Sequence, residues 1–276
     1  MIFGTNVLSV VPPSGPIRIW DAQCTWADLE KKRGTWDWTR LDAIVNSAGK
    51  RSIMLVLGHP PAWAAKGGPD GKQAAWMSAG SNRPPSNMNV WKMYISAVVN
   101  RYKGRIGCYQ IWNEPADKRF YTGTYSELAT LMKVAYTLIK QIDKNATVIS
   151  PPLQPRRQAA WATRGQSILK CFASVGYPFD VYSMHIYPQK DEGIKGFRQQ
   201  CTMVKAALFQ KPQKPLWITE TNFNLGGIGN PYPLDIQAAI RTQVKHACND
   251  LNIARCYWYA YAYDNPSLIA INEFGV

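Results

Sequence analysis

Two short stretches place a carboxylate where a buried strand would end. Residues 109–112 have strand character and run into Asn113 and Glu114, and a proline then stops the strand. Residues 216–219 repeat the pattern and deliver Glu220. Side chains alternate between the two faces inside a strand, so Asn113 and Glu114 can project together only at its frayed end. The sequence therefore predicts two carboxylates at the carboxyl ends of two strands.

Paired carboxylates of this kind suit the cleavage of a glycosidic bond. One protonates the leaving oxygen, and the other attacks the anomeric carbon or activates water. Taken singly, Glu114 or Glu220 could instead be a strand-terminating acid that faces solvent. The recurrence of the pattern at a distance that accommodates three strand–helix units, of about 30 residues each, favours the catalytic interpretation.

Alternating strand and helix patterns position these two acids. Strand patterns occupy residues 1–6, 17–20, 52–58, 108–112, 147–152, 179–185, 216–222 and 254–260. Helical patterns occupy residues 37–48, 88–103, 124–142, 157–173, 193–210 and 234–250, and Thr124 with Glu127 forms a capping box before the third. Eight strands that alternate with helices imply a parallel sheet.

The count fits a closed (β/α)8 TIM barrel of the α/β class, as one domain over residues 1–276. The Pro-rich connection between the first two strands is short, so the first crossover could lack a proper helix. The sequence also stops short of a helix after the eighth strand. We find no GxGxxG or Walker pattern that would support an open nucleotide-binding sheet.

In such a barrel the functional groups gather at the carboxyl ends of the strands. The candidates at these ends are Asn6, Arg18, Asp21, His59, Trp63, Asn113, Glu114, Pro152, His185, Tyr187, Glu220 and Trp258. Both glutamates are in this set, from the fourth and seventh strands. The long loop after His59 is rich in Gly, Ser, Asn and Pro, and a loop of this length is more often functional than idle.

Composition narrows the class of protein. The hydrophobic fraction of 46% supports a sizeable core, and the 11 Trp and 14 Tyr could fill it or provide flat rings that stack on sugars. No apolar run reaches the roughly 18 residues of a membrane helix, and residues 1–4 already read as a strand rather than a signal peptide. We expect a monomer without a membrane span.

The formal net charge of +14 suggests a polyanionic neighbour, yet the basic residues are scattered. Short clusters occur at residues 31–33 and at Arg156-Arg157, and we recognise no nucleic-acid-binding module. A solvated basic surface is the first interpretation and an acidic glycan partner the second. We expect no nucleic-acid partner.

The cysteines and histidines do not indicate a metal site. Six dispersed cysteines lack a CxxC spacing, and the three histidines lie far apart in the sequence. Cys108 and Cys256 open predicted buried strands and should be small core residues. A disulfide between Cys171 and Cys201, or between Cys248 and Cys256, could form if the protein is exported. Two carboxylates suffice for the predicted chemistry, so we expect no metal and no organic cofactor.

The motifs around the two glutamates resemble the acid/base and nucleophile strands of clan A glycoside hydrolases, which are retaining enzymes on a (β/α)8 barrel: Ile111-Trp112-Asn113-Glu114-Pro115 and Trp217-Ile218-Thr219-Glu220. Within the clan the sequence resembles glycoside hydrolase family 39, and especially the bacterial exopolysaccharide endoglycosidases of the PslG type. Four further stretches carry this likeness: residues 17–21, 36–42, 101–106 and 185–188. Many members of that family have a histidine near the end of the first strand, where this chain has Asn6.

The resemblance implies a role for each candidate. Glu114 would be the general acid and then the general base, and Glu220 the nucleophile. Asn113 would bind the sugar 2-hydroxyl, or else cap its loop through an Asx turn. Arg18 would hold Glu220 ionised, or else form a structural ion pair with Asp21.

The remaining candidates are substrate-binding residues. His185 and Tyr187 would line the subsite around the cleaved bond, with His59 and Asp21 nearby. Trp258, Trp63 and Trp26 are candidate stacking platforms, although large aromatic residues also fill barrel mouths.

Three functions remain open at this level. The first is an endo-acting enzyme on a bacterial exopolysaccharide of the biofilm matrix, secreted or periplasmic. The second is an exo-acting or plant-polymer-directed member of the clan, such as a xylosidase or mannanase. The third is a glycan-binding barrel without catalysis, which the presence of both glutamates argues against.

Overall fold

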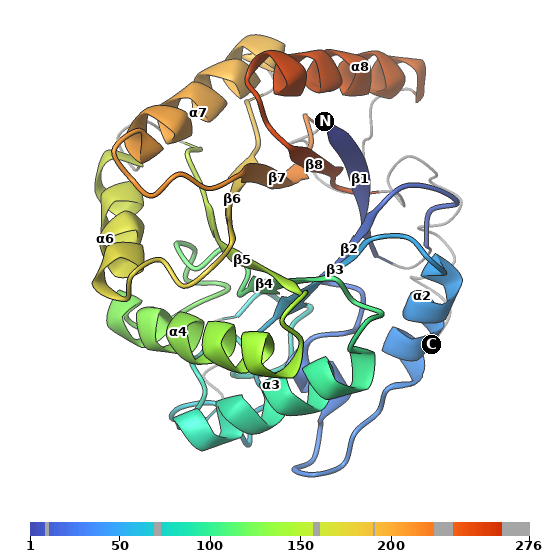
Figure 1. Ribbon diagram of the computed structural model, residues 1–276, viewed down its shortest axis with the longest axis vertical. Coiled ribbons are helices and arrows are strands. Elements are labelled where there is room, and N and C mark those ends of the chain that lie inside the picture. The colour runs from blue at the N-terminus through green and yellow to red at the C-terminus, as the bar shows by residue number, and fades with distance from the viewer. Residues whose placement is uncertain (9–10, 69–72, 157–160, 190, 224–233, 261–276) are drawn as a thin grey trace.

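The structure is a computed structural model that describes residues 1–8, 11–68, 73–156, 161–189, 191–223 and 234–260. Eight parallel strands follow one another around a closed barrel, and the last strand pairs with the first (Figure 1). The strands are β1 (Ile2–Val7), β2 (Ile17–Ile19), β3 (Ile53–Leu57), β4 (Cys108–Ile111), β5 (Thr147–Leu153), β6 (Val181–Ile186), β7 (Leu216–Thr221) and β8 (Arg255–Trp258). The predicted TIM barrel is confirmed.

Helices surround this barrel (Figure 1). They are α1 (Trp26–Leu29), α2 (Thr39–Ala48), α3 (Met88–Tyr102), α4 (Tyr125–Ile142), the π-helical turn η1 (Trp161–Gly165), α6 (Gln166–Ser174), α7 (Gly193–Leu208) and α8 (Leu234–Asp250). The predicted capping box is present at the start of α4, where Thr124 and Glu127 satisfy each other's backbone N–H groups.

The local predictions differ from the structure in a few places. The described residues between β1 and β2 contain no helix, as the short connection suggested. The four-residue helix α1 lies in a stretch for which no helix was predicted, because a single turn is too short for a periodic pattern to show. The predicted helix over 157–173 begins, in its described part, with the π-helical turn η1. Residues 261–276, where a final helix was in question, lie outside the described residues.

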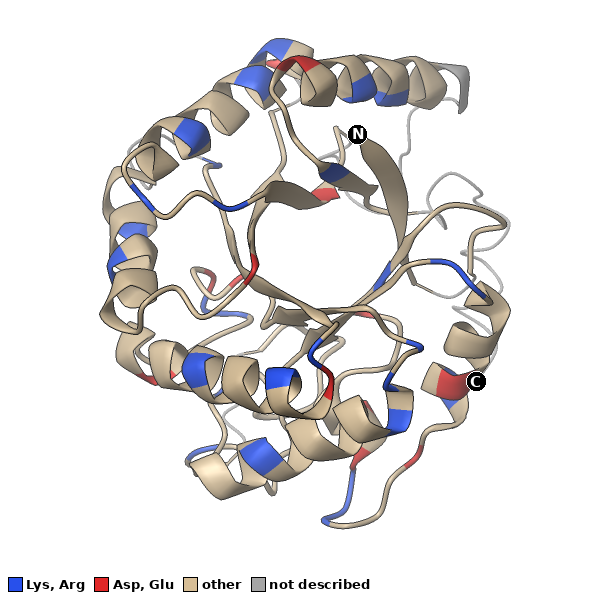
Figure 2. Cartoon of the chain, viewed as in Figure 1, with Lys and Arg blue, Asp and Glu red and all other residues tan. Residues whose placement is uncertain are grey.

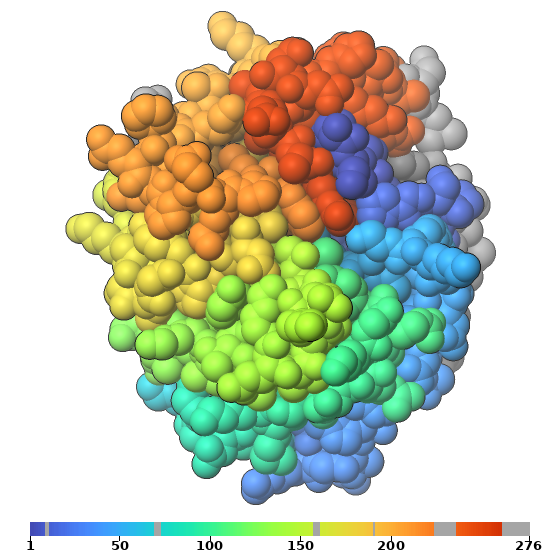
Figure 3. Space-filling model, in the orientation of Figure 1, coloured from blue at the N-terminus to red at the C-terminus, as the bar shows by residue number. Residues whose placement is uncertain are grey.

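The barrel interior is built in layers because alternate residues of each strand face inward. The lower layer is an apolar cluster from six successive strands: Met54, Cys108, Ile149, Val181, Trp217 and Tyr257. Above it on β4, Gln110 donates to Ser183 Oγ at 2.9 Å and to Thr219 Oγ1 at 3.1 Å across the barrel. The opening between the ribbons in Figure 1 is thus filled by side chains, as the space-filling view shows (Figure 3).

The surface charges, the cysteines and the helices can each be compared with the expectations from the sequence. Lys and Arg residues are spread over several of the outer helices and loops in the view of Figure 2. All six cysteines are buried free thiols, so neither suggested disulfide is present. Among the described helices, none combines the length and the apolar character that a bilayer span requires.

Candidate active site

The turn after β4 explains how Asn113 and Glu114 come to project together. The strand ends at Ile111, and Trp112 and Glu114 then adopt left-handed backbone conformations, with φ of 64° and 38°. Such conformations are costly for residues with a Cβ and persist where the surrounding structure holds them. Trp112 is held by full burial and by its Nε1, which donates to the Phe120 carbonyl at 2.8 Å.

A β-bulge in β7 aims Glu220 into the barrel. In the pairing with β6, Met184 lies opposite Ile218 and His185 lies opposite Glu220, so Thr219 is an extra residue. Thr219 already faces inward because its hydroxyl accepts from Gln110. In a regular strand, alternation would turn Glu220 toward the helices, and the bulge is what keeps it facing inward. Bulges of this kind re-aim side chains beside active sites.

Arg18 of β2 contacts four polar side chains of the site. It is fully buried, and its Nη1 lies 2.6 Å from Glu220 Oε1. The same guanidinium donates to the side-chain oxygens of Asn6, Gln110 and Asn113, each at 2.8 Å. Arg18 therefore pairs with Glu220, as the first of its two predicted roles requires, and it also fixes the orientation of the Asn113 amide.

The two glutamates have different partners, which prepares them for different tasks. Glu220 accepts from Arg18 and, at 2.6 Å, from the Tyr187 hydroxyl, so its charge is well compensated. Burial raises the pKa of Glu114, and the guanidinium of Arg156, 2.8 Å away, opposes this rise. A buried carboxyl group whose pKa is raised, beside a carboxylate held by two donors, is the arrangement expected of an acid/base and a nucleophile.

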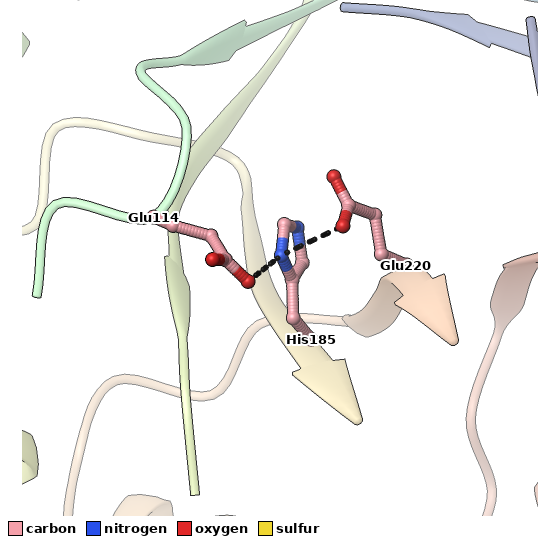
Figure 4. A group of neighbouring side chains, drawn as sticks. All are labelled: Glu114, His185 and Glu220. Carbon is pink, nitrogen blue, oxygen red and sulfur yellow. Dashed lines mark hydrogen bonds and ion pairs between the residues drawn. The ribbon is translucent and has the colours of Figure 1, made fainter. Parts of the chain in front are cut away.

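The separation of the two carboxyl groups fits a retaining mechanism. One oxygen of Glu114, one oxygen of Glu220 and a ring nitrogen of His185 all lie within 4.8 Å of one another. Retaining enzymes hold their carboxyl groups about 5–5.5 Å apart, whereas inverting enzymes leave about 6.5–9.5 Å for a water molecule. Figure 4 shows His185 between the two acids, with contacts of 2.9 Å to Glu114 and 3.4 Å to Glu220.

The same three side chains could also be considered as metal ligands. Burial lowers the pKa of His185 to about 3, so its ring is neutral, as a metal ligand would be. However, Arg18 and Arg156 already contact the two carboxylates, and a divalent cation would be placed beside two fixed positive charges. This donor set therefore fits a pair of catalytic acids better than a metal site.

Asp21 lies beside this centre without joining it. The Tyr259 hydroxyl donates to Asp21 Oδ2, and no ion pair with Arg18 is formed among the described contacts. Burial raises the pKa of Asp21 to about 7, while the bond from Tyr259 lowers it and the nearby charge of Glu220 raises it further. Asp21 also lines a small cavity with Trp76.

His59 and Trp63 lie toward the β3 side of the barrel. His59 is buried between Trp20 and Trp112, with ring centroids 4.7 Å and 4.8 Å away, and burial lowers its pKa to about 3. Trp63 is partly buried, and its Nε1 donates to the Glu30 carbonyl at 2.9 Å. His59 is thus held as a neutral side chain, and Trp63 keeps some exposed ring surface.

Two predicted stacking platforms lie elsewhere. Trp26 is fully buried in the core and stacks on Tyr94 at 4.5 Å, so it has no face for a sugar. Trp258 is buried on the outer side of β8, where Arg241 of α8 lies 5.8 Å from its ring. The correction has a simple cause, because Tyr257 faces the barrel interior and alternation turns the next residue outward. Tyr259, not Trp258, contacts Asp21.

Sequence reasoning missed three residues of this region. Arg156 was noted as part of a basic cluster, without a place in the site. Gln110 is a polar residue inside an apolar strand, which is a signal that could have been used. Trp76, in the long loop after β3, is 56% exposed and packs edge-on against Trp20 at 5.3 Å, so it is a better candidate platform than Trp26.

Comparison with known proteins now identifies the family. The profile described as Glycosyl hydrolase family 10 matches residues 19–250, which include both glutamates. This chain belongs to glycosyl hydrolase family 10. The family 39 likeness holds at the level of the clan A (β/α)8 glycoside hydrolases, and the comparisons support neither family 39 membership nor exopolysaccharide specificity.

Two curated relatives are similar to this chain over most of its length. The chain is 25% identical to a beta-xylosidase of Geobacillus stearothermophilus, over 81% of this chain and 48% of that protein. It is also 25% identical to endo-1,4-beta-xylanase 3 of Hypocrea jecorina, over 84% of this chain and 61% of that protein. The chain therefore spans about half to three fifths of the length of these relatives.

The structural neighbours share the fold. A glucosidase from Croceicoccus marinus superposes with a TM-score of 0.73 at 12% identity, over 94% of this chain and 59% of that one. A family 39 glycoside hydrolase from Bacteroides cellulosilyticus WH2 gives a TM-score of 0.63 at 18% identity, over 94% and 56%. At these identities the likeness shows the barrel alone.

Proposed function

We propose that this protein is a retaining glycoside hydrolase that cleaves the 1,4-β-linked backbone of a xylan-type polysaccharide. The observation that carries the proposal is the pair Glu114 and Glu220, which face each other within 4.8 Å at the ends of β4 and β7. The names of the curated relatives support the substrate class.

The reaction proceeds by double displacement. Glu220 attacks the anomeric carbon, the bond to the leaving oxygen breaks, and Glu114 gives its proton to that oxygen. Water then attacks the glycosyl-enzyme ester, the Glu114 carboxylate takes the proton of the water, and Glu220 is released. Arg18 and Tyr187 stabilise the charge of Glu220 before attack and after release.

Asn113 and Trp76 are the proposed substrate contacts. Arg18 donates to Asn113 Oδ1 at 2.8 Å. This bond directs the amide NH2 group of Asn113 away from Arg18. An amide at this place suits the 2-hydroxyl of the sugar, a contact that strengthens in the transition state. Trp76 provides an exposed ring for stacking.

The test is hydrolysis of a panel that contains xylan, mannan and bacterial exopolysaccharides. Wild type is compared with Glu114→Gln and Glu220→Gln, and Glu127→Gln, which changes the α4 capping box, is the matched control. We expect oligosaccharides of retained anomeric configuration, seen by NMR, from wild type and from the control, and loss of activity in the two site variants.

Other outcomes separate the alternatives. Release of monosaccharides would indicate an exo-acting enzyme, and hydrolysis of an exopolysaccharide without xylan would restore the first expectation from the sequence. Inverted products would refute the retaining mechanism. Tight glycan binding without hydrolysis would indicate a binding barrel. Because polymers of this size are met outside the cell, we also propose export, which fractionation of the native host would test.

A further inference from the structure

Arg156 contacts the carboxyl group of Glu114 and is itself partly exposed. It follows the end of β5, and its Nη2 donates to Glu114 Oε1 at 2.8 Å. The Arg156 side chain is 37% exposed, whereas that of Glu114 is 3% exposed. Its guanidinium carbon also lies 4.7 Å from the centre of the Tyr187 ring. The positive charge is therefore held in place by Tyr187 and Glu114 while remaining accessible.

This contact opposes the task of Glu114. An acid catalyst has to keep its proton, and a guanidinium group at hydrogen-bond distance favours the ionised carboxylate. Burial raises the pKa of Glu114, and Arg156 is the strongest influence that lowers it. Among the described residues, the other charged or titratable groups that face Glu114 are His185 of β6, Tyr187 after β6, Glu220 of β7, Arg18 of β2, and Asp117 and Arg119 of its own loop. If Arg156 bound another group, burial would raise the pKa of Glu114 with less opposition.

A cavity lies where such a partner could bind. It has a volume of about 270 Å³ and lies between Arg156, after β5, and residues of the β6–α7 connection and α7. Amide side chains of Gln189, Gln199 and Gln200 line it, and amides pair well with sugar hydroxyls. Glu192 is the carboxylate in its wall, and its Oε2 accepts from the Gln189 backbone N–H.

Two buried polar atoms at this cavity lack partners in the described part of the chain. They are Arg156 Nε and the Oε1 of Gln200, which is buried and donates from its Nε2 to the Tyr187 carbonyl. Buried polar atoms are normally satisfied, so unpartnered ones beside a cavity indicate a place for a polar ligand. Arg156 thus has donor capacity beyond its bond to Glu114.

We propose that Arg156 is a specificity-determining residue that binds the carboxylate of a uronic acid on the leaving-group side of the scissile bond. The inference rests on the proposed glycosidase function and names its preferred substrate class as an acidic glycan. The leaving-group side follows because Arg156 contacts Glu114, which protonates the leaving oxygen. A guanidinium group matches a carboxylate in charge and geometry, and the net charge of +14 favours approach of an anionic polymer.

Binding and catalysis would then be coupled. In the free protein Arg156 pairs with Glu114. When a substrate carboxylate takes the guanidinium, Glu114 holds its proton more firmly, in time to donate it to the leaving oxygen. A neutral glycan leaves Arg156 on Glu114 and gains no such help.

The experiment compares a linear xylo-oligosaccharide with the same oligosaccharide carrying a glucuronosyl branch. The variants are Arg156→Gln and Arg156→Lys, and Arg198→Gln is the matched control because this exposed arginine pairs with Asp250 on the outer helices. We expect wild type and control to favour the acidic substrate in kcat/KM, and Arg156→Gln to lose about 10- to 100-fold on that substrate, as for one hydrogen bond to a charged group. Arg156→Lys should retain part of the preference.

A pH profile distinguishes this role from a structural one. On the neutral substrate, the basic limb of kcat/KM for Arg156→Gln should move to higher pH, because free Glu114 then keeps its proton longer. A side chain that merely supports the fold would leave the limb in place. Hydrolysis of neutral xylan with no acidic preference, or a preference that survives in Arg156→Gln, overturns this inference and leaves the proposed function standing.

Binding provides a readout that does not need turnover. In the Glu220→Gln background the Arg156–Glu114 contact is retained, and calorimetry should show tighter binding of the acidic oligosaccharide than of the neutral one. Adding Arg156→Gln should abolish that difference. Equal binding of the two oligosaccharides in the Glu220→Gln background refutes the inference. Absence of hydrolysis of either substrate by wild type refutes the proposed function.

Discussion

The ion pair between Arg18 and Glu220 predicts a large loss of stability when Arg18 is replaced by methionine. Arg18 is fully buried and lies 2.6 Å from the carboxylate, which is itself almost buried. Removing one member of a buried pair leaves the other charge uncompensated, at a cost of about 3–5 kcal/mol. For a domain of this size each kcal/mol lowers Tm by about 2–4 °C, so we expect a fall of roughly 6–20 °C.

The measurement is thermal and urea unfolding without substrate, with Arg101→Met as the matched control. Arg101 pairs with Asp42 at a similar distance, but on the surface, where the two side chains are 40% and 35% exposed. Surface pairs contribute about 0–1 kcal/mol. The two substitutions are chemically identical, so their comparison gives the cost of removing a buried arginine with all its hydrogen bonds relative to an exposed one.

A double-mutant cycle tests the cause of the loss. If the uncompensated charge of Glu220 is responsible, then Glu220→Gln in the Arg18→Met background should recover part of the stability, because a neutral amide tolerates burial better. The reasoning is refuted if Arg18→Met and Arg101→Met cost the same. It is also refuted if the second substitution recovers nothing.

Three further predictions follow from individual contacts. Tyr187→Phe should lower kcat about 10- to 100-fold by removing the hydroxyl bond to the nucleophile, with KM and unfolding measured alongside; an unchanged kcat would contradict this. Asp21 has its pKa raised to about 7, so its ionisation costs stability as pH rises from about 4 to 7; Asp21→Asn should therefore stabilise the protein at pH 8 and not at pH 4, in thermal unfolding at both values. At Gly58, with φ of 143°, an added Cβ would lie 2.7 Å from the Trp112 ring, whereas at Gly49, with φ of 60°, no atom lies within 4 Å. Gly58→Ala should therefore destabilise the protein more than Gly49→Ala. Equal midpoints of urea unfolding for the two variants would contradict this.

Local signals in the sequence were sufficient for the fold. Apolar runs between turn residues marked each of the eight strands, helical spacing marked the longer helices, and Thr124 with Glu127 marked the start of α4. These features depend on neighbouring residues, so they can be recognised without knowledge of the tertiary structure. The single turn of α1 offered too few residues for such a pattern.

The site was only partly predictable, because facing directions depend on register. Trp258 and Tyr259 are adjacent, and one turns toward α8 while the other reaches Asp21. Nothing in the local sequence tells which of two adjacent aromatic residues faces inward. The bulge at Thr219 was equally hidden, since it is defined by the pairing of β7 with β6 and β8.

The sequence by itself determined the alternation of strands and helices and the two glutamates at strand ends, because strand periodicity and the stop signals are local. Only the tertiary structure brought Arg18 to Glu220, 202 residues away along the chain, and Arg156 to Glu114. Barrel closure decides which strand ends become neighbours, and the left-handed turn after β4 and the bulge in β7 decide which side chains meet there. The two glutamates were recognisable in the sequence, and the charged groups that distinguish their environments were brought together by the fold.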